Sequence, residues 1–187
     1  MKKLKLFILG LLLLPALCLG YMNPYIAGVV SSAVALTIDM MEYATDGAAQ
    51  SAYPSSDTTP LQSYSEDTII TQGSNALKLI ATTDALNETV TKTLTGGDIL
   101  DLTGKNTIKF DARSTGTGSN LQASIHDAGG TTSTYTIPIA SADTYEAQEW
   151  DISAIADASK DNIDQLQLKV LNAGSARTFY IDNMRAE

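Results

Sequence analysis

The sequence is poor in the residues on which catalysis and metal binding most often depend. Its 187 residues include one cysteine, one histidine and one tryptophan, and only 18% of the residues are charged. A lone histidine without cysteines is a poor zinc site, because structural zinc takes four nitrogen or sulfur ligands. The chain also lacks the glycine-flanked serine of a nucleophile elbow. We therefore expect a protein that is not an enzyme.

Basic residues are scarce outside the first five positions. The formal net charge is −9, and without Lys2, Lys3 and Lys5 nine basic residues remain against 21 acidic ones, a net charge of −12. Such a surface repels phosphate backbones and anionic lipid, which excludes nucleic acid as a partner. The same acidity suits calcium, which prefers oxygen ligands.

The N-terminus has the three-part form of a secretory signal peptide. A basic start precedes an apolar run over residues 6–14, and Pro15 and small residues follow as far as Gly20. Leu17 precedes Cys18 where a lipoprotein signal requires a small residue. We predict a signal peptide at residues 1–20, a linker at 21–35 and a secreted or cell-surface domain at 36–187.

A second apolar stretch leaves an alternative open. Residues 25–38 are weakly apolar and number 14, fewer than the roughly 20 residues that a membrane-spanning helix needs. In the alternative, the N-terminal segment stays uncleaved as a hydrophobic anchor helix. Contact with a membrane is then expected only through this segment.

The rest of the chain is dominated by short runs in which apolar and polar residues alternate. Alternation is clearest at residues 107–113, 121–126 and 163–171, and turn-forming residues separate the runs. We predict nine or ten strands, a short helical turn at 153–161 and no long amphipathic helix. This pattern predicts an all-β antiparallel sandwich or jelly roll, in which 107–113 and 121–126 form a hairpin.

Five segments in serial order resemble one known group of domains. They are residues 38–42 (Ile-Asp-Met-Met-Glu), 73–79 (Gly-Ser-Asn-Ala-Leu-Lys-Leu), 101–110, 149–153 (Glu-Trp-Asp-Ile-Ser) and 179–184 (Phe-Tyr-Ile-Asp-Asn-Met). Together they resemble the carbohydrate-binding-module type of galactose-binding-like jelly roll, over residues 36–187. Each segment alone is only a strand signature, so the order carries the resemblance. It implies a domain that binds sugars without chemistry.

The resemblance also implies a structural calcium ion. It would lie where the first strand, the turn at residues 73–75 and the last strand converge. Its ligands would be Asp39 or Glu42, backbone carbonyls near Gly73 and Asn75, and the carboxylate of Asp182. Calcium accepts six to eight oxygens of this mixed kind. The alternative is that these acids are solvated or accept hydrogen bonds from backbone N–H groups.

A sugar site requires polar groups that converge and, usually, an aromatic platform. Arg113, Gln122, His126 and Gln167 lie on the polar faces of alternating strands, and Tyr135 is a candidate for stacking. If the strands neighbour one another, these five residues form a hydrogen-bonding surface suited to hydroxyl groups. The alternative is the ordinary solvated face of a sheet.

The predicted function is therefore that of a secreted, non-catalytic carbohydrate-binding or surface-recognition module, whose partner is a glycan or cell-surface polysaccharide. The alternative is a structural or adhesion component of a cell envelope or phage virion that contacts protein. A homo-oligomer is expected under the alternative.

Overall fold

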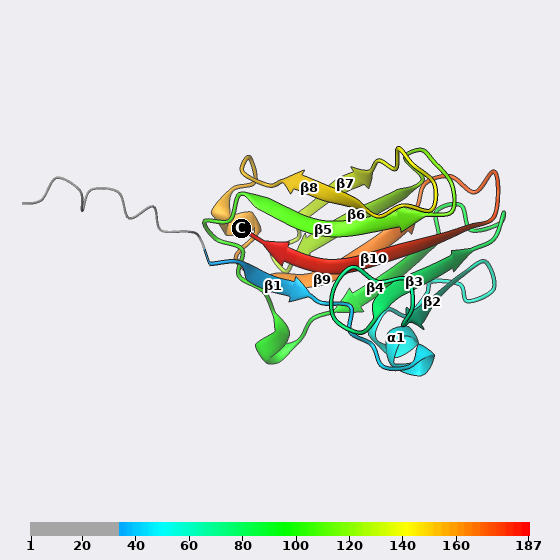
Figure 1. The fold of residues 1–187 in the computed structure, drawn as a ribbon. Coiled ribbons are helices and arrows are strands. Elements are labelled where there is room, and N and C mark those ends of the chain that lie inside the picture. The colour runs from blue at the N-terminus through cyan, green and yellow to red at the C-terminus, as the bar shows by residue number, and fades with distance from the viewer. Residues whose placement is uncertain (1–33) are drawn as a thin grey trace, which may run out of the picture. The chain divides into compact units, whose positions relative to one another are not determined.

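Ten β-strands in two antiparallel sheets make up most of the regular structure of residues 34–187, the part of the chain that the computed structural model describes (Figure 1). The predicted signal peptide or anchor and most of the linker lie outside these described residues. Within residues 34–187, no helix is long and apolar enough to cross a membrane.

The larger sheet, sheet A, has the strand order β2-β3-β10-β5-β8, and β1 also pairs with β10. The first strand begins where the domain was predicted to start. The strand bounds are β1 Leu36–Asp39, β2 Leu61–Glu66, β3 Ala76–Ala81, β5 Thr107–Ser114, β8 Glu146–Asp151 and β10 Arg177–Ala186.

The smaller sheet, sheet B, has the order β4-β9-β6-β7 and faces sheet A across the core (Figure 1). Its strands are β4 Thr89–Thr93, β6 Leu121–Asp127, β7 Thr132–Ile137 and β9 Ile163–Val170. Short 3₁₀ turns occur at Gly96–Asp98 and Asp157–Ser159. The second of these lies within the helical turn predicted at 153–161.

Alternation along the strands produces the two layers. In β5, Ile108, Phe110 and Ala112 are buried in the core, while the residues between them are only half-buried. Because successive side chains of a strand point to opposite faces, such a strand is stable with one apolar face against a partner sheet. The predicted all-β sandwich is confirmed for the described residues.

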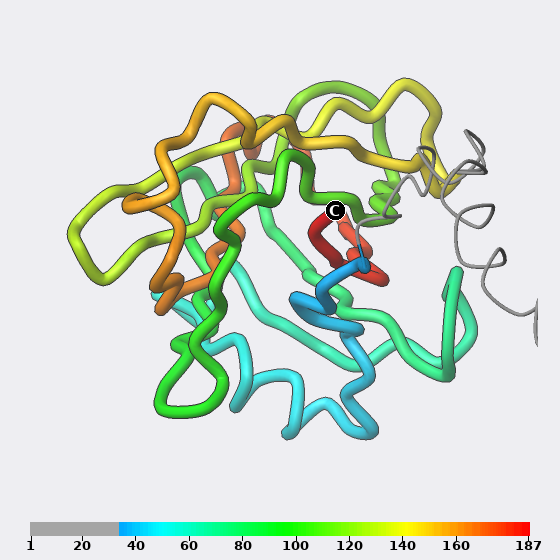
Figure 2. The backbone as a smooth tube through the Cα atoms, turned by 90° about the vertical axis from the view of Figure 1, so that its left-hand side faces the viewer, coloured from blue at the N-terminus to red at the C-terminus, as the bar shows by residue number. Residues whose placement is uncertain are grey.

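The first and last strands of the described chain are neighbours. Leu36 pairs with Ala186, and Asp39 pairs with Met184 after a bulge. Figure 2 shows the start of the described chain in blue beside the C-terminal strand in red. This pairing joins the two ends of the domain through backbone hydrogen bonds, as we expected from the sequence.

The predicted hairpin between residues 107–113 and 121–126 is wrong. Strand β5 pairs with β10 and β8 in sheet A, and β6 pairs with β7 and β9 in sheet B. The loop at 115–120 therefore crosses from one sheet to the other. Alternation records which side of a strand is buried, but it does not record which strands are neighbours.

A helix that the sequence did not reveal occupies part of the segment between β1 and β2. Helix α1 (Asp46–Ala52) begins after Thr45, whose side-chain oxygen accepts a hydrogen bond from the backbone N–H of Ala48 at 3.2 Å. This side chain is an N-cap, because it satisfies a donor that the first turn leaves unpaired. The short length of α1 hides its period in the sequence.

Candidate functional site

The outer face of sheet B carries a regular array of polar side chains, nearly all of them uncharged. The strand registers align three rows of four residues across β4, β9, β6 and β7. The rows are Thr89-Lys169-Gln122-Thr136, Thr91-Gln167-Ser124-Thr134 and Thr93-Gln165-His126-Thr132. None of the twelve side chains is aromatic, and only one is a permanent cation.

A bulge in β9 shapes one end of this array. His126 pairs with Gln165 and the next residue of β6 pairs with Ile163, so Asp164 is the extra residue. A bulge of this kind bends the strand and re-aims its side chains. As a result, the Asp164 carboxylate reaches the His126 ring, with Oδ1 at 2.6 Å from Nδ1. This contact orients the imidazole and leaves Nε2 for other partners.

A shallow pocket lies beside the bulge. Its volume is about 80 Å³, and all its lining residues are polar: Ser124, His126, Thr132, Gln165 and Gln167. Ser124 is 6% exposed, and its small side chain leaves room between its larger neighbours. Gln167 donates a hydrogen bond from Nε2 to Thr91 Oγ1 at 3.1 Å, which holds its amide in place. The pocket offers both donors and acceptors, as sugar hydroxyl groups require.

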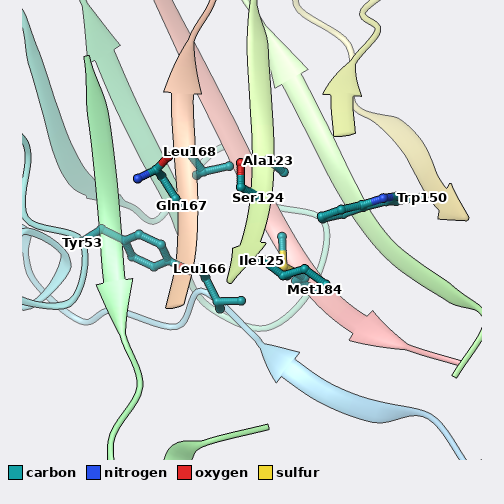
Figure 3. A pocket seen from close by; sticks show the side chains of 9 residues that line it. All are labelled: Tyr53, Ala123, Ser124, Ile125, Trp150, Leu166, Gln167, Leu168 and Met184. Carbon is teal, nitrogen blue, oxygen red and sulfur yellow. The ribbon is translucent and has the colours of Figure 1, made fainter. Parts of the chain in front are cut away.

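The interior of the sandwich contains a second, smaller cavity between the sheets. Figure 3 shows Tyr53, Trp150 and Met184 among the side chains around it. Its volume is about 10 Å³, close to that of a single water-sized sphere. This cavity is therefore a packing defect of the core, too small for a sugar.

Of the five predicted ligand-binding residues, the structure brings three together. Gln122, His126 and Gln167 lie on the outer face of sheet B. Arg113 is on sheet A, where it packs over the ring of Tyr180, 5.3 Å from guanidinium carbon to ring centroid. Arg113 and the other three predicted residues therefore lie on different sheets.

Tyr135 also lies away from this surface. It turns toward the core, where its ring stacks on Trp150 with centroids 5.9 Å apart, and its hydroxyl bonds Gln148 Oε1 at 3.2 Å. Burial raises the pKa of the Tyr135 phenol. The sequence held the signal for this orientation, because Tyr135 shares its alternation with the buried Ile137. The same alternation points to Thr132, a pocket residue that the sequence reasoning missed.

A loop covers part of the outer face of sheet A and is hydrogen-bonded to side chains of that face. The loop at 67–75 lies over it, because the backbone N–H groups of Thr71 and Gln72 donate to Asp182 Oδ2 at 2.8 and 3.0 Å. Tyr145 donates from its hydroxyl to the carbonyl of Ile69 at 2.9 Å. Burial, and then the charge of Asp182, raise the pKa of Tyr145 above its usual range.

Asp39, the first predicted calcium ligand, is occupied by protein donors. Its Oδ2 lies 2.7 Å from Lys92 Nζ and accepts hydrogen bonds from Tyr43 at 2.6 Å and Tyr53 at 3.1 Å. Burial, followed by the charge of Asp39, raises the pKa of the Tyr43 phenol far above its usual range. An ammonium group at this distance repels a metal ion, so Asp39 does not fit a calcium site.

Glu42 is engaged in a similar way. Both of its carboxylate oxygens accept from the N–H of Ser74 at 3.0 Å, and Oε2 also accepts from Asn75 at 3.1 Å. Gly73 lies against the same carboxylate, since an added Cβ would be 1.5 Å from Oε1. Backbone N–H donors of the turn therefore satisfy the Glu42 carboxylate.

Asp182 combines a bonded oxygen with an unbonded one. Oδ2 takes the loop donors, whereas Oδ1 is buried without a hydrogen-bond partner among the described residues. Within residues 34–187, no three acidic, histidine or cysteine side chains gather as a metal site. Calcium therefore stays a prediction from the resemblance alone.

Solved structures resemble this chain, although no family model and no curated protein matches it. A family 11 carbohydrate-binding module from Clostridium thermocellum, in complex with a β-1,3-1,4-mixed-linked tetrasaccharide, superposes with a TM-score of 0.59 at 15% identity, over 81% of this chain and 94% of that one. The chain has the jelly-roll fold of carbohydrate-binding modules. The predicted resemblance is thereby confirmed at the level of the fold.

Two further structures share this fold. The family 11 module of a Clostridium thermocellum cellulosomal cellulase gives a TM-score of 0.52 at 15% identity, covering 72% of this chain and 85% of that one. An exo-beta-agarase gives 0.55 at 17% identity, covering 68% of this chain but only 22% of the agarase. In the agarase, the matching region is therefore only one part of a longer chain.

Proposed function

We propose that this protein is a secreted, non-catalytic module that binds a glycan on the outer face of sheet B, with His126, Gln165 and Gln167 as the principal contacts. The observation that carries the proposal is the pocket beside the β9 bulge. It is open, entirely polar and lined from three strands. The fold of carbohydrate-binding modules supports the same class of function, and the signal-peptide pattern at residues 1–20 supports export.

The chemistry of the face suits a neutral sugar. A glutamine amide offers a donor and an acceptor side by side, which matches two adjacent hydroxyl groups. Within residues 34–187, the only carboxylate bonded to a pocket residue is Asp164, which is paired with His126 at 2.6 Å. Because this pair and the acidic net charge disfavour anions, the preferred ligand is an uncharged polysaccharide or glycan.

A glycan array and affinity electrophoresis on the purified protein test the proposal. We expect retention by at least one neutral polysaccharide, reduced about threefold to tenfold by Gln167→Ala, since one net hydrogen bond contributes roughly 0.5–1.5 kcal/mol. The matched control is Gln62→Ala, which removes an amide from the outer face of sheet A. Equal losses in both variants, or no retention by any glycan, would contradict the proposal.

A further inference from the structure

We infer that the site recognises a single sugar unit, at a chain end or a side branch, and not an extended stretch of polysaccharide. This inference rests on the proposed function and specifies its ligand. The pocket volume of about 80 Å³ is well below the roughly 300–1,000 Å³ of pockets that enclose a drug-sized ligand. A hollow of this size accommodates one sugar unit at most.

The position of the pocket supports the same conclusion. Its five residues occupy the end of the array nearest the bulge, in the rows of His126 and Ser124. The row that contains Gln122 and Lys169 contributes no residue to the pocket. A ligand that ran along the whole face would therefore leave this pocket after about one unit.

The composition of the face adds a second argument. A long chain is usually held by aromatic rings on which successive sugar rings stack, because each stacked ring buries a large apolar area. The twelve side chains of the array include no aromatic residue, and Tyr135 on β7 turns inward to stack on Trp150. Without such a track, additional sugar units gain little affinity beyond the first.

The bulge explains why a single unit is favoured at this end. Asp164 fixes the His126 ring through Nδ1, and Thr91 fixes the Gln167 amide. Two of the five lining side chains are therefore held before a ligand arrives. Groups that are already ordered lose less conformational entropy on binding, so the gain is concentrated at this point.

Calorimetric titration with saccharides of one to six units tests the inference. We expect the dissociation constant to change by less than about threefold between the one-unit ligand and the six-unit ligand. A fall of tenfold or more along the series would overturn the inference and leave the proposed function intact. Failure of every saccharide to bind would overturn both.

Three substitutions and one spectroscopic signal locate the ligand. Gln165→Ala should weaken binding of the one-unit ligand about threefold to tenfold, while Gln62→Ala on the opposite sheet serves as the control. His126 is the only histidine, so its imidazole NMR signals should shift when the one-unit ligand saturates the site. A loss in Gln122→Ala as large as that in Gln165→Ala, or an unchanged His126 signal, would show that the ligand lies elsewhere on the face.

Discussion

The outer faces of the two sheets use polar residues in opposite ways. On sheet A the charged side chains have protein partners: Glu66 pairs with Lys78 at 2.9 Å, Arg113 with Asp143 at 3.1 Å, and Asp182 holds the loop at 67–75. On sheet B the open pocket is lined by amides, hydroxyls and the imidazole of His126. Side chains whose bonding capacity is used within the protein stabilise the fold, whereas those with capacity to spare can bind a ligand.

The largest expected effect on stability is that of replacing Asp182, which is fully buried. Asp182→Ala removes the acceptor of two backbone donors and of the Thr71 hydroxyl. We expect the free energy of unfolding to fall by about 3 kcal/mol, since hydrogen bonds to charged groups contribute roughly 1.5–3 kcal/mol each and are not additive. Urea unfolding followed by fluorescence of the single tryptophan measures this. Asp111→Ala, the half-buried cross-strand neighbour, is the control and should cost less than about 1 kcal/mol.

Alanine substitutions of Arg113 and His126 distinguish the roles of the two faces most directly, when both stability and glycan affinity are measured. Arg113→Ala removes the packing over Tyr180, so we expect about 1 kcal/mol less stability and an unchanged glycan affinity. His126→Ala should lower glycan affinity while the stability changes by less than about 0.5 kcal/mol. A glycan affinity that depends on Arg113 would place the ligand on sheet A and break the comparison.

Glu66 makes the stability of sheet A sensitive to acid. Burial by itself raises the pKa of Glu66, but hydrogen bonds from Thr68 and Lys78 outweigh it and lower the pKa from 4.5 to about 2. Because the folded-state pKa lies below the unfolded one, this stabilisation is present above pH 4.5 and is lost as the pH falls toward 2. We expect Glu66→Gln to lower stability by about 1 kcal/mol at pH 7 and by much less near pH 2. An equal loss at both pH values would contradict this assignment.

The smallest expected effect is that of a chelator. Asp39 and Glu42 are satisfied by Lys92, by tyrosines and by backbone N–H groups. We therefore expect EDTA to change the melting temperature by less than about 1 °C, below the roughly 2–4 °C that 1 kcal/mol causes in a domain of this size. A large drop that calcium reverses would show that an ion binds the folded state, with the buried Oδ1 of Asp182 as the place to look.

The fold was predictable because its signals are local. Alternation at Ile108, Phe110 and Ala112 marks a strand with one buried face, and the serial order of strand signatures indicated a jelly roll. Helix α1 was missed, because seven residues are too few to show a helical period. Of the five residues predicted to bind a ligand, Gln122, His126 and Gln167 share one surface, whereas Arg113 and Tyr135 lie elsewhere. The signal for excluding Tyr135 was present in its own strand, since it alternates in phase with Ile137.

The sequence by itself determined that this chain forms short antiparallel strands, buries one side of each and carries an acidic, nearly cysteine-free surface. Only the tertiary structure decided that Arg113 and His126 lie on opposite sheets, and that Asp39 meets Lys92, 53 positions away in the chain. The physical reason is that a period of two records whether a residue faces in or out. Which strands become neighbours depends on the crossover at 115–120 and on the bulge at Asp164, where distant segments are brought together.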